Sequence, residues 1–289
     1  MTLTHEVGKH LELADPAHGG RVLWRYVYAG KPKPFFHPLC TPSGRVLSLL
    51  EPYDHWWQRG LWFAIKFVNG ENFWEEKEGT VWGEQRTVAP PAVNHLEGGR
   101  ITIFSRVQWD RPRGSGVIFD EQRKFEYRPV DERSYALDFL FSLTPTDDVK
   151  LDRTPFTTWG GYGGLTFRGT KDWHQPQLLF SDGSTSTRPV GNSALWCDLS
   201  GWLDGGIRPS GGIAMFDHPS NLRHPTPWYG SIEASHYFNP AFLFHEPMVV
   251  AAGEPLNLRY RVLVHDGMGE REWLQKKYEE YLATENPRS

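Results

Sequence analysis

The chain has 289 residues, a formal charge of −4 at neutral pH and an aromatic content of 14%. This length is enough to bury a full hydrophobic core. The slightly negative charge offers no basic stripe for a polyanion, so nucleic acid is not an expected partner.

Neither a targeting segment nor a membrane span is expected from the sequence. The first 20 residues contain acidic side chains and no apolar run of the kind found in a signal peptide. No window reaches the roughly 18 consecutive apolar residues that would cross a bilayer. Cys40 and Cys197 are far apart in the sequence and predict no disulfide framework. We therefore expect a cytoplasmic protein without a membrane partner.

Alternation of apolar and polar residues predicts strands along most of the chain. In the stretch 135–143, for example, Tyr135, Leu137, Phe139 and Phe141 share one side, which is typical of a half-buried strand. The same pattern is clear over 101–109 and 256–264. Shorter runs predict further strands over 22–28, 61–68, 125–128, 178–180, 194–198 and 212–216.

Frequent turn residues leave little room for helices. The chain contains 29 Gly and 22 Pro, and only its end has a helical pattern, with Leu274, Tyr278 and Leu282 on one face. These features predict an all-β fold, a large antiparallel β-sandwich in one domain over 1–289. Its core would span 20–267, and a short C-terminal helix would span 268–284. A division into two domains near 145–155 is the alternative.

Polar residues suited to chemistry gather in two segments that are also rich in aromatic residues. The first segment is 35–76, and it contains His37, Asp54, His55, Arg59, Asn69, Glu71, Asn72, Glu75 and Glu76 among Trp56, Trp57, Trp62 and Trp74. The second is 216–246, and it contains Asp217, His218, Arg223, His224, Trp228, Glu233, His236, Asn239, His245 and Glu246. Both segments are too polar for a core and too aromatic for ordinary loops.

This mixture is typical of a carbohydrate site. A sugar ring packs a patch of C–H groups on an aromatic face, and its hydroxyls need paired donors and acceptors. We therefore expect a small-molecule sugar as the ligand. The alternative is that the tryptophans build the sandwich core and the polar residues cap turns.

The histidines have a structural interpretation as well as a catalytic one. His37 and His224 each precede a proline and could be rigid turn residues. No H-E-x-x-H or other compact spacing indicates a metal site. Histidines on different strands could still converge on a divalent ion, so the metal ligands are undetermined and no cofactor is predicted with certainty.

Nucleotide-binding and serine-hydrolase motifs are absent from the sequence. There is no G-x-S-x-G elbow, no G-x-x-x-x-G-K-[ST] loop and no G-x-G-x-x-G turn before a helix. The glycine-rich run 159–165 is too aromatic for a phosphate cradle and indicates close approach of backbones instead.

The two polar segments carry a resemblance to a known family. The stretches that carry it are FHPLCTPSG, DHWWQRGLWF, VNGENFWEE, FDHPSNLRHPTPWY, FNPAFLFHEP and LRYRVLVHDG. They resemble the PmoA-like family, whose function is unassigned and whose name refers to methane oxygenase. They span about residues 35–267. Family members usually read D-H-x-x-H-R-G in the first segment, but Gln58 stands at the second His position here.

The resemblance implies a fold and a metabolic setting. The PmoA-like family looks related to the galactose-mutarotase supersandwich group, and its members tend to accompany sugar dehydrogenases and isomerases. The resemblance therefore implies carbohydrate processing, with a sugar dehydrogenase as a functional partner. A membrane copper oxygenase would need spanning helices, which the sequence lacks.

Our sequence-based hypothesis is a lyase or epimerase that acts on an oxidised (3-keto) sugar or glycoside. Such chemistry needs a base near neutral pKa, a cation or donors at the enolate oxygen and an acid for the leaving group. The base would be His55 or His218.

Other roles go to the remaining polar residues of the two segments. Arg59, His37 and His224 would hold the enolate oxygen, with a divalent ion as the alternative electrophile. Glu246 and Glu75 would assist the leaving group or bind hydroxyls. The residues expected to bind substrate are Asp54, Trp62, Asn69, Trp74, Glu75, Asp217, Trp228 and His245.

Two other function classes remain open from the sequence. One is a mutarotase or hydrolase that acts on an unoxidised sugar. The other is a sugar-binding module without catalysis.

Overall fold

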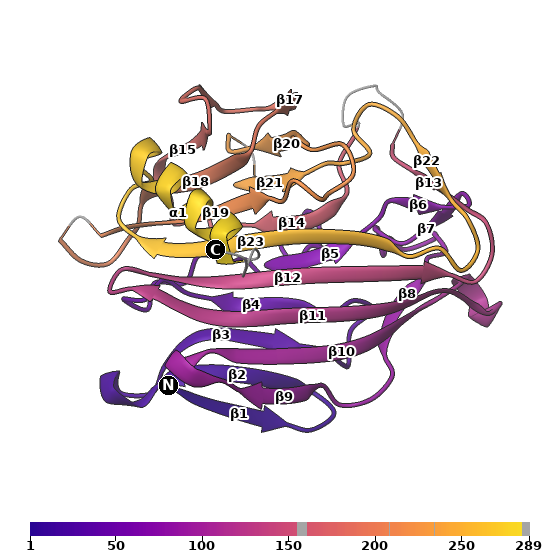
Figure 1. Ribbon diagram of the computed structural model, residues 1–289, viewed down its shortest axis with the longest axis horizontal. Coiled ribbons are helices and arrows are strands. Elements are labelled where there is room, and N and C mark those ends of the chain that lie inside the picture. The colour runs from indigo at the N-terminus through magenta and orange to yellow at the C-terminus, as the bar shows by residue number, and fades with distance from the viewer. Residues whose placement is uncertain (155–160, 208, 234, 285–289) are drawn as a thin grey trace.

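The protein is built almost entirely of antiparallel strands, which confirms the predicted all-β sandwich with a short C-terminal helix (Figure 1). The computed structural model describes residues 1–154, 161–207, 209–233 and 235–284. Within these residues, three sheets contain the strands, and the two larger sheets form the layers of the sandwich.

The first large sheet has nine strands and begins at the N-terminus. Its order is β1-β2-β3-β4-β5-β14-β21-β20-β17. In that order the strands are Thr2–Glu6, His10–Asp15, Arg21–Val27, Phe35–Leu39, Leu61–Ala64, Gly164–Arg168, Tyr237–Pro240, Pro227–Ser231 and Val190–Ser193. The sandwich thus begins earlier than the predicted residue 20, because Leu11 and Leu13 already point into the core.

The second large sheet contains the longest strands, and β10, β11 and β12 lie side by side in Figure 1. Its order is β16-β15-β18-β19-β23-β12-β11-β10-β8, and β9 also pairs with β10. In that order the strands are Thr185–Ser186, His174–Phe180, Trp196–Trp202, Ser210–Asp217, Leu256–Asp266, Ser134–Pro145, Val117–Asp131, Ile101–Asp110 and Glu84–Thr87, with β9 at Ala92–His95.

Smaller elements complete the fold. A four-stranded sheet has the order β22-β13-β6-β7, with strands Met248–Val250, Val149–Asp152, Phe67–Val68 and Glu71–Asn72. The stretch predicted as one strand over 61–68 is therefore two strands, β5 and β6, in different sheets. Three short 3-10 helices lie at Pro16–His18, Glu97–Gly99 and Pro112–Gly114.

Aromatic side chains fill the space between the two large sheets. Trp24, Tyr26 and Phe36 come from the nine-stranded sheet, and Phe125 and Phe139 come from the ten-stranded sheet. The ring of Phe125 lies 5.0 Å from the rings of both Tyr26 and Phe36 and 5.9 Å from that of Trp24. The alternation read from the sequence therefore identifies core residues correctly on these strands.

The C-terminal helix α1 (Arg271–Thr284) covers the outer face of the ten-stranded sheet (Figure 1). Its buried residues Leu274, Tyr278 and Tyr281 pack in a cluster with residues such as Trp196 and Phe216 of that sheet. The helix begins three residues later than predicted. The preceding backbone is held at Gly269, whose N–H donates to Ser200 Oγ at 2.9 Å.

Truncation of Phe125 tests the core. We expect Phe125→Ala to lower the free energy of unfolding by about 3–5 kcal/mol, because it opens a cavity at the centre of the aromatic contacts. Urea unfolding followed by tryptophan fluorescence measures the change. Gln122→Ala, at an exposed position of the same strand, is the control and should cost about 0.5 kcal/mol or less. A loss below about 1 kcal/mol for Phe125→Ala would contradict this description of the core.

Candidate functional site

A cavity lies on the face of the nine-stranded sheet that points away from the sandwich core. Successive residues on a strand point to opposite faces of a sheet. On β14, Phe167 packs in the core, so Arg168 points to the other face; on β20, Trp228 packs in the core and Tyr229 points to the other face. The same alternation that builds the core thus supplies the floor of the cavity.

The cavity has a volume of about 470 Å³, which is in the range of small-molecule sites. Aromatic rings and charged groups line it together. The lining comprises Trp57, Phe67, Trp74, Tyr162, Tyr229 and Tyr237, the charged or titratable residues Asp54, His55, Lys66, Glu75, Lys77 and Arg168, and the polar residues Gln58, Thr154, Ser231 and Ser235.

One polar group in the cavity is centred on Asp54. His55 Nδ1 lies 2.9 Å from Asp54 Oδ2, and since a carboxylate only accepts, Nδ1 carries the proton and donates. Arg168 Nη2 donates to both Asp54 oxygens at 3.3 and 3.4 Å, and Arg168 Nη1 donates to Gln58 Oε1 at 2.8 Å. Gln58 therefore helps to hold the guanidinium.

Electrostatics keep the Asp54 carboxylate ionised. Partial burial raises the pKa of Asp54, but the hydrogen bond from His55 and the charge of Arg168 outweigh it, so the net pKa lies below the usual value. Burial lowers the pKa of Arg168, and Asp54 opposes that change. The group therefore presents an oriented imidazole beside a buried cation.

A second polar group in the cavity pairs Lys66 with Glu75. Lys66 Nζ lies 2.9 Å from Glu75 Oε1, and the Tyr162 hydroxyl donates to the same oxygen at 3.5 Å. Lys77 approaches that oxygen at 3.8 Å from the rim. Burial lowers the pKa of Lys66 even though Glu75 raises it. Trp74, which precedes Glu75, is buried and packs its ring 5.1 Å from that of Tyr162.

The structure brings four predicted site residues together in this cavity, namely Asp54, His55, Trp74 and Glu75. Trp62 lies next to them but does not line the cavity. Its ring is 3% exposed and packs 5.5 Å from that of Trp74. The part of the first segment that follows β4 therefore supplies much of the site.

Arg59 lies in a buried ion network and does not line the cavity. Its Nη1 and Nη2 donate to the two oxygens of Glu76 at 2.8 and 2.5 Å, and its Nε donates to Glu51 at 2.8 Å. Lys33 Nζ adds a further contact to Glu76 at 2.5 Å. Because these carboxylates occupy the guanidinium, the structure favours Arg168 over Arg59 as the cation at a bound ligand.

His37 lies on β4 outside the cavity lining. Ser48 Oγ accepts a hydrogen bond from the Leu39 N–H at 2.9 Å and lies 2.8 Å from His37 Nδ1. A neutral imidazole can accept the Ser48 proton there. Burial lowers the pKa of His37 to about 4. The contacts of His37 therefore favour a structural role over a catalytic one.

Residues predicted from the second segment are dispersed. Asp217 is fully buried and accepts from Asn221 Nδ2 at 2.7 Å, from Thr226 N at 2.9 Å and Oγ1 at 2.7 Å, and from His224 Nδ1 at 2.8 Å. Asp217 and His224 thus organise a loop. His218 contacts Ser220 Oγ at 2.7 Å, and its ring lies 5.6 Å from that of Tyr281 on α1.

The remaining predicted residues also lie outside the described lining. Trp228 is buried in the core and donates from Nε1 to the Ala194 carbonyl at 3.0 Å. Glu246 is exposed and pairs with Arg223 at 3.2 Å. His245 is exposed, and its carbonyl accepts from Arg153. Asn69 closes a turn with a positive φ of 51° and accepts from the Lys150 N–H at 2.7 Å.

Several lining residues were missed because their signals were weak or ambiguous. Arg168 is the last residue of the short strand β14. Because Leu165 and Phe167 point into the core, the alternation along the strand puts Arg168 on the other face of the sheet, and this was its only signal in the sequence. Tyr229 and Tyr237 lie in the second segment but were not singled out. Tyr162 lies in the glycine-rich run 159–165. A Cβ on Gly161 would come within 2.3 Å of the Phe244 ring, so the chain packs too closely there for a side chain. Residues 159–160 of that run are outside the described residues.

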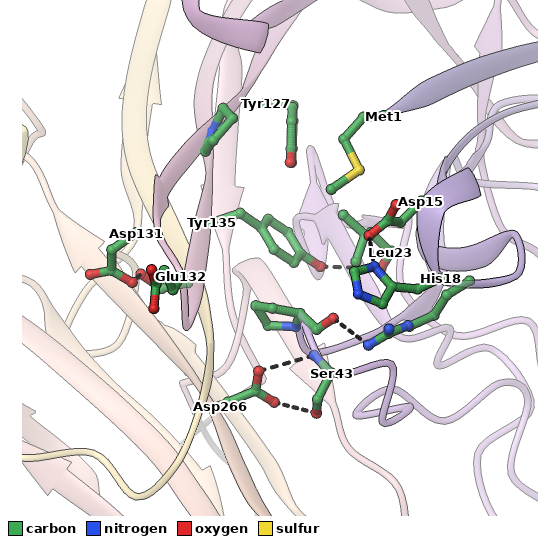
Figure 2. A pocket seen from close by; sticks show the side chains of 14 residues that line it. Met1, Asp15, His18, Leu23, Ser43, Tyr127, Asp131, Glu132, Tyr135 and Asp266 are labelled. Carbon is green, nitrogen blue, oxygen red and sulfur yellow. Dashed lines mark hydrogen bonds and ion pairs between the residues drawn. The ribbon is translucent and has the colours of Figure 1, made fainter.

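A second hollow opens at the N-terminal end of the sandwich, and Figure 2 shows its lining. It has a volume of about 380 Å³. Its described lining includes none of the predicted site residues, and the three aspartates of that lining have partners within the fold. Asp266 accepts from the Ser43 N–H at 3.0 Å, and Asp15 contacts His18 Nδ1 at 2.6 Å. Tyr135 directs its hydroxyl to the backbone carbonyls of Leu23 and Cys40. The cavity on the nine-stranded sheet is therefore the better candidate.

Metal and membrane signals are lacking in the described part of the chain. Its residues contain no group of three or more His, Cys, Asp or Glu side chains placed to hold a metal ion. No described helix is long and apolar enough to cross a membrane.

The low pKa of His37 predicts a pH-dependent stability. The unfolded chain takes up this proton near pH 6.5, whereas the folded chain takes it up near pH 4. Between these values the unfolded state binds more protons, so stability falls as pH falls, by at most about 1.4 kcal/mol per pH unit. We expect His37→Gln to reduce this slope in urea unfolding between pH 7 and 5. His95→Gln, at an exposed histidine of β9, should leave it unchanged. Equal slopes for His37→Gln and the unmodified protein would contradict the assignment.

Comparison with known proteins places the chain in a family. The comparison with curated proteins finds no match. A family model, described as a family of unknown function (DUF6807), matches residues 14–279. This range includes the cavity residues and nearly all strands of both large sheets. The protein therefore belongs to the DUF6807 family of unknown function.

Proposed function

We propose that the chain is a carbohydrate-active enzyme of the lyase or epimerase type that acts on an oxidised (3-keto) sugar or glycoside in the cavity of the nine-stranded sheet. The observation that carries this proposal is the lining of a single cavity by aromatic rings, an imidazole held by a carboxylate and a buried guanidinium.

The cavity surface supports a sugar as the ligand. The rings of Trp74, Tyr162 and Tyr229 adjoin one another, with centroid separations of 5.1 and 5.6 Å, and provide apolar contact for the C–H face of a sugar ring. Ser231 and Ser235 supply hydroxyls that donate and accept, so they can pair with sugar hydroxyls. This combination of a few polar groups with aromatic walls is typical of a specific small-molecule site.

Proton abstraction next to a ketone is the chemistry that the Asp54 group supports. With Nδ1 donating to Asp54, the Nε2 atom of His55 has its lone pair available as a general base. The imidazolium that forms is stabilised by the Asp54 carboxylate. Arg168, a cation that lines the same cavity, would hold the enolate oxygen.

The sequence resemblances fit the same proposal but carry less weight. Similarity to the PmoA-like family and to the galactose-mutarotase supersandwich group suggests carbohydrate processing, and a partner sugar dehydrogenase would supply the 3-keto substrate. A divalent ion was only the alternative electrophile of the sequence-based hypothesis, and elemental analysis of the purified protein tests it.

Incubation of the purified protein with 3-keto-glucosides and with the parent glucosides tests this function. We expect only the keto substrates to yield a product that absorbs in the near ultraviolet, because elimination gives an enone. His55→Ala should lower the rate by about 10²–10⁴-fold, as expected for loss of a general base.

The matched control is His174→Ala, since His174 also pairs with an aspartate, Asp204 at 2.8 Å, but lies outside the cavity. Its rate should equal that of the unmodified protein. Binding of sugars without turnover of any keto substrate would contradict the enzyme and identify a sugar-binding module. Anomer exchange or hydrolysis of the parent sugars would identify the mutarotase or hydrolase class instead.

A further inference from the structure

Lys66 is a buried lysine in the cavity that the proton abstraction by His55 does not use. It lies between β5 and β6, directly before Phe67, and is 4% exposed. Lysine is almost never fully buried unless it is paired. Its Nζ lies 2.9 Å from Glu75 Oε1, 5.2 Å from the centre of the Phe67 ring and 5.9 Å from that of Tyr162. Glu75, Phe67 and Tyr162 all line the cavity.

The surroundings of Lys66 differ from those of the structural ion pairs. Arg123 and Glu121 are both buried, and Arg123 makes two contacts to Glu121 and one to Gln85. Lys33 contacts a carboxylate and a backbone carbonyl. The ammonium of Lys66, by contrast, has Glu75 as its one acceptor in contact among the described residues. An ammonium has three donors, so Lys66 retains donors for a ligand.

Burial makes Lys66 a stronger acid than an ordinary lysine. Burial lowers the pKa of Lys66, and the positive charge of Lys77 acts in the same direction, while Glu75 opposes both. Lys33 also interacts electrostatically with Lys66. Tyr162 stays neutral, because burial raises its pKa to about 12. A general acid works best when its pKa lies close to the working pH.

The geometry points to Lys66 as the general acid that protonates the leaving oxygen of a glycoside, with Glu75 as the residue that positions it. This inference rests on the proposed function. In the reaction, His55 takes the proton from the carbon beside the ketone, and the electron pair of that C–H bond forms the enolate. The enolate then re-forms the ketone while its C=C electrons expel the glycosidic oxygen. The C–O bond breaks, and Lys66 gives its proton to that oxygen. Solvent later takes the proton from His55 and returns one to Lys66. The products are an enone and an alcohol, so no oxidant or reductant is consumed.

Two substrates that differ only in their leaving group distinguish a general-acid role of Lys66 from a purely structural role. The substrates are a methyl 3-keto-glucoside, whose alkoxide needs a proton, and a 4-nitrophenyl 3-keto-glucoside, whose phenolate leaves without one. We expect Lys66→Met to slow the methyl substrate by about 10²–10⁴-fold and the nitrophenyl substrate by less than tenfold. Lys150→Met is the control, because Lys150 pairs with Asp152 at 3.0 Å outside the cavity. It should leave both rates unchanged.

The pH profile of Glu75→Gln gives a second test, which can be carried out even if Lys66→Met does not fold. Turnover of the methyl substrate needs protonated Lys66 and falls as pH rises through its pKa. Because Glu75 raises that pKa, its removal should move the fall to lower pH. An unmoved profile would overturn the inference.

The two proposals fail in different ways. If the unmodified protein turns over neither substrate, the proposed function fails and Lys66 loses its role with it. If the unmodified protein turns over both substrates and Lys66→Met slows both equally or neither, only the assignment of Lys66 is overturned.

Discussion

The nine-stranded sheet carries large apolar side chains on both faces, and the rest of the structure depends on this constraint. One face meets the ten-stranded sheet and forms the sandwich core through residues such as Phe36 and Phe63. The other face carries Phe35, Trp62 and Tyr237. An apolar face cannot be left to water over a large area without cost. Turns fold over it, and the space between turns and sheet is the cavity.

Buried charges fix the positions of the cavity walls. Glu76 binds both Arg59 and Lys33, and two of these three residues adjoin a wall: Glu76 follows Glu75, and Arg59 follows Gln58. Removal of one partner from such a network typically costs about 3–5 kcal/mol, because a charge is left unpaired in the interior. Arg59, which the sequence suggested as a catalytic cation, therefore holds the His55 turn against the Glu75 turn.

The fold was more predictable than the site. The strand over 135–143 could be read from alternation, because the pleat forces every second side chain into the core. Asp54 and His55 were predicted as neighbours in a polar segment, and they do share the cavity. Arg168 and Lys66 were not predicted, because each is one charged residue next to an apolar strand, and nothing local shows whether such a residue lies in a cavity or in a buried ion pair. His218 and His224 illustrate the reverse case: the composition of their segment suggested chemistry, whereas they lie outside the cavity lining and contact Ser220 and Asp217, respectively.

The sequence by itself determined that the chain forms an antiparallel sandwich with a terminal helix, since periodicity and turn residues act over a few neighbouring positions. It also placed a polar, aromatic segment around Asp54 and Glu75. Only the tertiary structure decided which charges meet. Arg168 lies 114 residues from Asp54, and Tyr162 lies 87 residues from Glu75. Such pairs form because distant strands adjoin in one sheet, and the order of strands in a sheet is set by the packing of the whole chain.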